Sequence, residues 1–382
     1  MKLEHLVIEN FRGIERLELS FLDKLGLVRD TAIFAGPNTS GKTTILDAIA
    51  LCLMPVTGGC QIREGLRLTA PALVHSGAAQ ARVEAHVWFD DDEIEATREV
   101  MERSGNAFAR SLPAQNLIKV YWEFPDGQGG DQLGSHRCDP VYGPLLFQGR
   151  RVLENFLHVP GLGPRLFERL GSVVMFDQER RGSSMRISDR ERVMLGAPLA
   201  PDQNGGMRQN GGIALPVEDP RLILTNLALR ALLPQTHKAT EKEDFARLKK
   251  LYEHVCHPHC IGDLFNTEQG FDIGFSGDRG KYFYDGLSSG QEMILFMLLQ
   301  FATKRVHRSI VLIDELELHL HPLWQDRLLV SLPKLGEDNQ FFITTHSTHI
   351  RDTTDPNSHY RTGDLSTSVK VLAGAPGRES DG

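Results

Sequence analysis

The sequence has few cysteines and no apolar run long enough to cross a bilayer. Its five cysteines are an odd number at scattered positions, which does not suit a disulfide framework and favours a reducing compartment. The longest apolar run, residues 293–302, is interrupted by Gln300 and is far shorter than a transmembrane helix. The opening residues lack the charged and then apolar pattern of a signal peptide. We therefore expect a soluble, cytoplasmic protein with no membrane contact.

An excess of positive charge is also missing. The chain of 382 residues carries 42 Lys and Arg against 50 Asp and Glu, a net charge of −8, which argues against a basic coat for nucleic acid. No long heptad stretch and no internal repeat are visible, which excludes a coiled-coil rod. One arginine cluster comprises Arg150, Arg151, Arg180, Arg181, Arg186, Arg190 and Arg192. We interpret it as a solvated face, with nucleic acid or a partner protein as the alternatives.

What is present is an α/β pattern. Apolar and polar residues alternate over 17–21, 83–89 and 118–124, which predicts antiparallel strands covered on one face. Short apolar segments at 31–35 and 172–176 predict two further strands. Those at 310–313 and 341–344 are typical of parallel strands buried on both faces. The Gly-, Asn- and Gln-rich stretch 201–212 cannot form a packed core and is predicted to be a mobile surface loop.

Residues 36–44, GPNTSGKTT, fit the phosphate-binding motif G-x-x-x-x-G-K-[ST] in full. The motif lies between a predicted strand and a predicted helix, a context that a chance glycine-rich turn rarely has. Backbone N–H groups of such a loop bind phosphates, while Lys42 neutralises them and Thr43 is placed to ligate Mg²⁺. The nucleotide-binding residues predicted here are Gly36, Asn38, Thr39, Ser40, Gly41, Lys42, Thr43 and Thr44.

Two carboxylates and a histidine follow strands in the last third of the chain. Asp314 and Glu315 come directly after the apolar segment 310–313, where a parallel strand would deliver them beside the phosphate loop. Asp314 would hold Mg²⁺, and Glu315 would orient and deprotonate the attacking water. His346 ends the next strand and is a candidate contact of the γ-phosphate or of that water. The alternatives are a solvated acidic strand end and a structural histidine.

The segment 287–291, LSSGQ, precedes a long apolar helix. Ser288 and Gln291 form a capping box, and the same helix start is a candidate anion site. The segment resembles the signature of the ABC ATPase superfamily, and the order of phosphate loop, signature, acidic strand end and histidine is similar as well. The resemblance implies bound ATP and Mg²⁺, with two ATP sandwiched in a head-to-tail dimer. In that dimer Ser288, Ser289, Gly290 and Gln291 of one subunit would close over nucleotide held by the other.

Further segments are similar to one branch of this superfamily. Gln178, after the predicted strand 172–176, resembles the family glutamine that touches Mg²⁺ and the attacking water. Residues 8–13, IENFRG, resemble the opening of RecF, SMC and OLD-type ATPases, which makes Arg12 a candidate phosphate contact. Residues 314–322, DELELHLHP, resemble the acidic-strand extension of OLD-like and PtuA-like ATPases, although Leu316 departs from the usual proline or asparagine. The wide spacing around Gln178 argues against a transporter subunit.

The resemblance implies an α/β fold of the ABC-ATPase type, with a mixed central sheet, an antiparallel β subdomain and an inserted, mostly helical subdomain. Residues 1–180 would form lobe I with the phosphate loop, and 181–286 the insertion. Residues 287–375 would form lobe II with the signature, and 376–382 a disordered tail. Few residues follow His346, so we expect a stand-alone ATPase without the nuclease domain that OLD nucleases carry there.

The segment 254–260, HVCHPHC, concentrates cysteine and histidine. A zinc site at Cys256 and Cys260, shared by two chains, is one interpretation, and an ordinary polar turn is the preferred one.

The resemblance implies three alternative functions, and the defence role in the first of them rests on the resemblance alone. The first is an ATP-hydrolysing ABC-type ATPase that dimerises on ATP and controls a separate nuclease or toxin in prokaryotic antiviral defence. The second is a RecF-like repair or replication ATPase with nucleic acid as its partner. The third is a slow ATP-gated scaffold for an effector. A homodimer or higher oligomer is expected.

Overall fold

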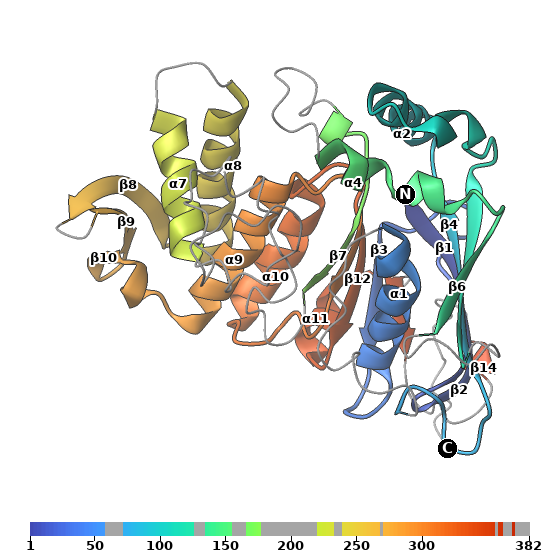
Figure 1. The fold of residues 1–382 in the computed structure, drawn as a ribbon. Helices are drawn as coiled ribbons and strands as arrows, with labels where there is room; N and C mark the ends of the chain where they lie inside the picture. Colours follow the sequence, from blue (N-terminus) through green and yellow to red (C-terminus); the bar gives the residue numbers. More distant parts are fainter. Residues whose placement is uncertain are drawn as a thin grey trace, which may run out of the picture.

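The computed structural model describes residues 1–57, 72–125, 134–154, 166–176, 220–232, 239–267, 270–355, 358–361 and 369–370. Three sheets and the helices between them make up this part of the chain (Figure 1). Within these ranges, no helix is both long enough and apolar enough to span a membrane.

A five-stranded sheet forms the centre of the molecule. Its strands are β13 (His359–Arg361), β3 (Thr31–Ala35), β12 (Gln340–Thr345), β11 (Ile310–Ile313) and β7 (Val173–Phe176), in that spatial order. All four pairings are parallel, so the carboxyl ends of these strands meet at one edge. Strands β7, β11 and β12 are buried along their whole length, as their apolar sequences predict.

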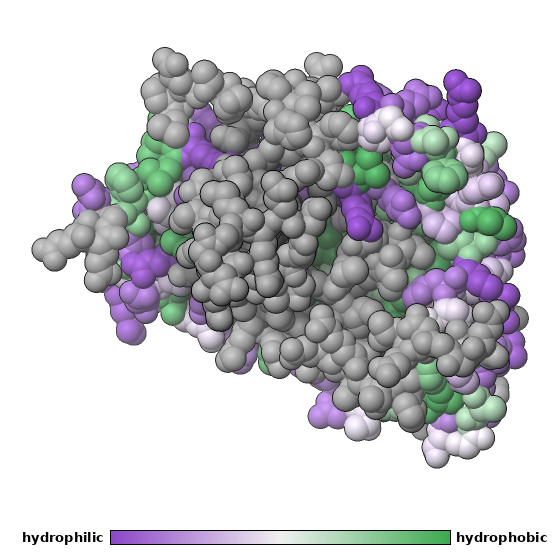
Figure 2. All heavy atoms as spheres, in the orientation of Figure 1, coloured by the Kyte–Doolittle hydropathy of each residue, from purple (hydrophilic) through white to green (hydrophobic). Residues whose placement is uncertain are grey.

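A six-stranded sheet lies beside it. Its order is β14 (Val369–Lys370), β2 (Ile14–Ser20), β1 (Lys2–Phe11), β4 (Ala81–Trp88), β5 (Leu117–Phe124) and β6 (Ser135–Asp139). All neighbours are antiparallel except β14 and β2. Buried and partly exposed residues alternate along β4 and β5, which confirms a sheet with one covered face. Figure 2 shows hydrophilic and hydrophobic residues mixed along this side of the molecule.

Helix α1 (Lys42–Thr57) fills the space between the two sheets (Figure 1). Its buried side chains share one core with the inner face of the six-stranded sheet and with alternate residues of the parallel sheet, such as Phe34, Leu312 and Phe342. The neighbouring residues Ile33, Ile313 and Phe341 point to the opposite face and belong to a second core. The period of two in a strand therefore places a core on each side of the central sheet.

The second core is covered by helices from the last third of the chain and from the insertion. Helix α9 (Ser289–Lys304) packs there with α8 (Ala239–Cys256), α7 (Pro220–Leu232) and α10 (Pro322–Ser331). A three-stranded antiparallel sheet, β8 (Cys260–Thr267), β9 (Gly270–Gly277) and β10 (Gly280–Phe283), flanks these helices and leads through η5 (Tyr284–Gly286) into α9. This sheet was not predicted from the sequence.

The remaining described elements are peripheral: α2 (Asp91–Arg103), η3 (Ala107–Ser111), α3 (Pro144–Phe147), α4 (Gly149–Glu154), η6 (Leu332–Lys334) and α11 (Thr348–Thr353). The α/β fold class with a separate antiparallel β unit is confirmed. The four-segment division of the chain stays a prediction, because the segment 201–212 and the tail 376–382 lie outside the described residues.

Candidate nucleotide site

The phosphate motif forms the turn from β3 into α1, as its sequence context predicts. Thr39 and Gly41 have positive φ angles of 65° and 83°, so the backbone turns sharply in front of the helix. Glycine adopts this conformation at no steric cost, which explains its place at position 41. The first turn of α1 begins at Lys42 and presents N–H groups that no earlier turn of the helix can satisfy.

The Lys42 ammonium lies within the loop. It donates hydrogen bonds to the carbonyl oxygens of Gly36 (2.9 Å) and Pro37 (2.7 Å) and is 3.4 Å from Ser40 Oγ. Burial lowers the pKa of this ammonium, and nearby carboxylates at the end of β11 oppose that shift. The carboxylates are those of Glu315, Glu317 and Asp314. The positive charge therefore faces a cluster of negative charge across the site.

The end of β11 lies directly beside the loop. Asp314 is fully buried and accepts hydrogen bonds from the hydroxyls of Thr43 (2.9 Å) and Thr344 (2.7 Å). The same Thr344 hydroxyl accepts the backbone N–H of Glu315 (2.8 Å), whose φ angle is positive at 50°. Thr344, on the neighbouring strand β12, thus fixes both acidic residues. Sequence reasoning missed this role, because a threonine in an apolar strand looks like an ordinary strand former.

His346 links the loop to the second carboxylate. Its Nδ1 is 3.3 Å from Lys42 Nζ, and its Nε2 is 3.4 Å from Glu315 Oε1. Because an ammonium can only donate, Nδ1 acts as the acceptor and the ring proton lies on Nε2, toward Glu315. The backbone N–H of His346 donates to Glu317, which also accepts the Thr345 hydroxyl at 2.8 Å. Glu317 therefore fixes the backbone at His346, and it is a second residue of the site that was not predicted from the sequence.

The oxygens of Thr43 and Asp314 suit Mg²⁺. They are hard ligands, they lie within hydrogen-bond distance of each other, and they face the end of the phosphate loop. Within the described part of the chain, no group of three or more His, Cys, Asp or Glu is arranged to hold a metal ion. A site of few protein ligands is what Mg²⁺ uses when phosphates and waters complete its shell.

Arg12 lies near α1 rather than on the loop itself. Its guanidinium donates to Asp47 Oδ2 at 2.6 Å, and Asp47 is buried in the second turn of α1. The role of Arg12 as a phosphate contact stays a prediction.

The signature-like segment begins α9, on the opposite face of the central sheet from α1 (Figure 1). Ser288 is the N-cap, and both bonds of the predicted capping box with Gln291 are present. A Cβ atom at Gly290 would lie 2.6 Å from the backbone oxygen of His319, so only glycine fits there. Hence the structure brings Lys42, Thr43, Asp314, Glu315 and His346 together. The signature-like segment instead begins a helix of the second core, on the other side of the central sheet from α1.

Other predicted residues have different outcomes. Gln178 and five of the clustered arginines, from position 180 to 192, lie outside the described residues. The interpretation of the cluster as a solvated face is wrong for Arg150, which is 8% exposed. Its guanidinium donates to the carbonyls of Phe167 and Leu170 and stacks 4.0 Å over the Phe167 ring. Its neighbour Arg151 is exposed.

The zinc interpretation finds no support in the described segment around position 256. The Cys256 side chain is buried in the second core, where burial raises the pKa of its thiol, whereas Cys260 Sγ lies 2.9 Å from Ser276 Oγ. Among the described residues, no cluster of three or more potential metal ligands includes either thiol, so zinc binding here is not supported.

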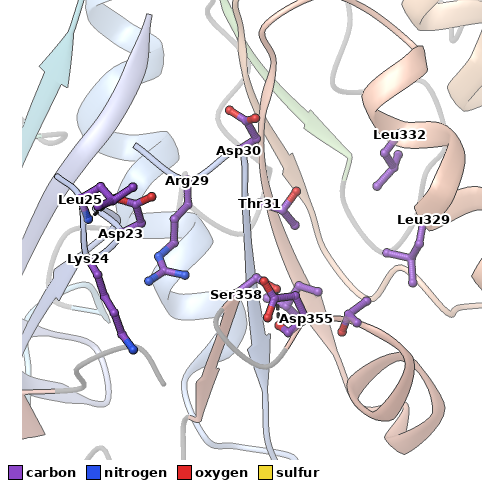
Figure 3. Close-up of a pocket in the computed structure, with 12 residues that line it drawn as sticks. Asp23, Lys24, Leu25, Arg29, Asp30, Thr31, Leu329, Leu332, Asp355 and Ser358 are labelled. Atoms are coloured by element: carbon purple, nitrogen blue, oxygen red, sulfur yellow. Dashed lines mark hydrogen bonds between the residues drawn. The ribbon is translucent and has the colours of Figure 1, made fainter. Parts of the chain in front are cut away.

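A cavity of about 600 Å³ lies at the other end of β3, around its first residue Thr31. Figure 3 shows Arg29 between the turn that carries Asp23 and Leu25 and the start of β3. Since β3 runs from Thr31 toward the phosphate loop, this cavity is separate from the nucleotide site.

The comparisons with known proteins agree with this geometry. The domain family described as "AAA domain, putative AbiEii toxin, Type IV TA system" matches residues 162–352, and a second "AAA domain" family matches residues 5–118. The chain belongs to the first of these two AAA families, whose match spans residues 162–352. It is an ABC-type P-loop ATPase of the OLD-like and PtuA-like group. The resemblance found in the sequence is thereby confirmed.

Two relatives illustrate the match. The chain is 30% identical over 111 residues to "Septu protein PtuA" of Bacillus thuringiensis, covering 24% of this chain and 28% of that protein. It is 36% identical over 80 residues to "Retron Ec83 probable ATPase" of Escherichia coli, covering 18% of this chain and 15% of that protein. The aligned segments therefore span less than a third of either relative.

Solved structures resemble the chain over nearly its whole length. The structure "SmcHead bound to the C-winged helix domain of ScpA" has a TM-score of 0.54 at 13% identity and covers 94% of each chain. An Smc head with an extended coiled coil, bound to ScpA derived from Pyrococcus furiosus, has a TM-score of 0.52 at 13% identity, covering 97% of this chain and 96% of that one. At this identity the likeness shows the ABC-type ATPase fold.

Proposed function

We propose that this chain binds and hydrolyses ATP, dimerises head to tail around it, and controls a separate effector protein in prokaryotic antiviral defence. The observation that carries the proposal is the convergence of Lys42, Thr43, Asp314, Glu315 and His346 at one edge of the central sheet. Phosphate binding, metal binding and water activation each have a suitable side chain there.

In the proposed hydrolysis of ATP, each of these side chains has one task. Lys42 would exchange its bonds to Gly36 and Pro37 for bonds to the phosphates. Thr43 and Asp314 would hold Mg²⁺, which would neutralise charge on the transferring phosphoryl group. Glu315 would take a proton from the attacking water, and the Nε2–H of His346 is close enough to orient that carboxylate.

Dimerisation is proposed because the signature-like segment lies apart from the loop of its own chain. The first N–H groups of α9 have no earlier turn of the helix to bond to, and they would suit a phosphate brought by a second subunit. Control of an effector and a role in defence are proposed from the likeness to the Septu and retron proteins.

Glu315→Gln tests the hydrolytic part. We expect this variant to bind ATP normally, to hydrolyse it about 100-fold to 10,000-fold more slowly, and to accumulate as a dimer with ATP and Mg²⁺. Lys42→Ala should abolish ATP binding. Glu102→Gln, an exposed position on α2, is the matched control and should behave as the parent. A wild-type rate in Glu315→Gln would show that the assigned base is wrong.

The effector part needs its own experiment. Tagged Glu315→Gln protein is purified with ATP and Mg²⁺ from its native host, beside Lys42→Ala as the control that cannot close. A stoichiometric nuclease or toxin-like protein, found by mass spectrometry only with Glu315→Gln, would support the proposal. Nucleic acid without a protein partner would favour a RecF-like ATPase instead.

A further inference from the structure

The segment rich in cysteine and histidine is turned toward the start of α9. The Nδ1 atom of His259 lies 2.8 Å from the hydroxyl oxygen of Tyr282, on β10. The backbone of the segment is tied to α10, since Arg327 donates to the carbonyl of His257 at 3.1 Å. The segment is therefore held between the three-stranded sheet and a helix that follows the acidic strand end.

Tyr282 continues the contact to the signature-like segment. Gln291 donates from Nε2 to the Tyr282 hydroxyl at 3.0 Å, and its Oε1 accepts the backbone N–H of Ser288 at 2.8 Å. Because the Gln291 amide can only donate from nitrogen, the phenol oxygen accepts that bond and its O–H is left to donate to His259. Flipping the Gln291 amide would break both of its bonds. Tyr282 thus fixes the orientation of the residue that caps the helix start.

The rings around this chain of bonds leave little room for movement. A Cβ atom at Gly277 would lie 2.4 Å from His259 Nδ1, so the histidine ring rests directly on the β9 backbone. Another neighbour is Trp324, whose ring is perpendicular to that of His259 with the two ring centroids 6.1 Å apart. A Cβ atom at Gly290 would lie 3.5 Å from the same indole. Trp324 therefore lies against both the histidine and the glycine of the signature-like segment.

We propose that Tyr282 is a positioning residue for the signature-like segment and that His259 holds its hydroxyl in place. Through these two residues the insertion sets how the start of α9 meets nucleotide on a second subunit. This inference rests on the proposed function, because it concerns how the ATP-closed dimer forms.

The test uses the full chain with Glu315→Gln as the parent. Adding Tyr282→Phe removes one oxygen atom, and we expect the ATP concentration for half-maximal dimerisation, measured by light scattering, to rise about threefold to tenfold. Binding of a fluorescent ATP analogue to the single subunit is measured separately in a Ser288→Arg background, which blocks closure. Tyr282→Phe should leave that dissociation constant unchanged, because Tyr282 acts only on the partner's nucleotide.

Two further variants separate positioning from general damage. His259→Leu should weaken dimerisation to a similar degree, and the double variant with Tyr282→Phe should be no worse than Tyr282→Phe alone, because the two residues act through one hydroxyl. Tyr121→Phe, on the outer face of β5, is the matched control and should dimerise like the parent.

The outcomes are distinct. If the parent does not dimerise with ATP, both the proposed function and this inference are overturned. If the parent dimerises and Tyr282→Phe does so at the same ATP concentration, only the inference fails. Equal weakening of single-subunit binding and dimerisation would also overturn it, because that result indicates loss of structure rather than loss of position.

Discussion

Thr344→Val tests whether one hydroxyl organises the acidic end of β11. Valine replaces the hydroxyl of threonine by a methyl group of similar size, so at this fully buried position the change removes chiefly the polar group. What disappears is the donor to Asp314 at 2.7 Å and the acceptor for the N–H of Glu315 at 2.8 Å.

The magnitude follows from those two bonds. A hydrogen bond to a charged group contributes about 1.5–3 kcal/mol, and a neutral one contributes about 1 kcal/mol. Because Asp314 keeps its hydrogen bond from Thr43, the total free energy of interaction lost in Thr344→Val is limited to about 2–3 kcal/mol. Glu315 has a positive φ angle, a conformation that costs a residue other than glycine about 1 kcal/mol or more, so it should relax once the bond to Thr344 is lost.

The assay is ATP turnover at saturating ATP over a range of Mg²⁺ concentrations. We expect kcat to fall about 10-fold to 100-fold and the Mg²⁺ requirement to rise, because both the metal ligand and the base lose a fixed position. Thr344→Ser keeps the hydroxyl and should recover most of the activity. If Thr344→Val turns over within about twofold of the wild type, the hydroxyl does not organise the site and this reasoning is refuted.

Three further predictions concern single positions. Gly290→Ala should lower the melting temperature by several degrees, since backbone must move away from the added carbon, whereas Gly13→Ala, with nothing within 4 Å of the added carbon, should not. Arg150→Ala should cost about 2–4 kcal/mol in urea unfolding, because buried carbonyls lose their donor, while the exposed Arg151→Ala should be nearly neutral. Burial, aided by four arginines, lowers the pKa of His307 from 6.5 to about 4. Between these values the unfolded chain binds the extra proton, so stability should fall as the pH drops from 6.5 toward 4. His307→Asn should flatten that dependence in urea titrations at several pH values.

Much of the site was predictable because it follows from parallel strand order. Asp314, Glu315 and His346 directly follow apolar strands, so parallel strand order allows them only at the edge where β3 meets the phosphate loop. The structure places them at that edge. The phosphate loop was recognisable because its glycines and lysine occur at fixed spacing between two elements of clear pattern.

What was missed depended on contacts between distant parts of the chain. The β8 strand shifts register between Ile261 and Leu264, which breaks the alternation that would have revealed it. Arg150 was assigned to a solvated face because sequence alone does not show that the carbonyl oxygens of residues 167 and 170 surround it. Glu317 looked like one more acid in an acidic run, and only the fold shows that it accepts the N–H of His346.

The position of α1 between two sheets has a thermodynamic consequence. The same helix begins at the phosphate lysine and contributes side chains between Ile45 and Leu53 to the core shared by both sheets. A ligand that binds only the folded state adds its binding free energy to the stability of every element that must unfold with its site. Nucleotide held at the first turn of α1 should therefore slow amide hydrogen exchange in β4 and β5 as well as in the loop. Strands β4 and β5 of the six-stranded sheet, which contribute no side chain to the predicted chemistry, would then report nucleotide occupancy.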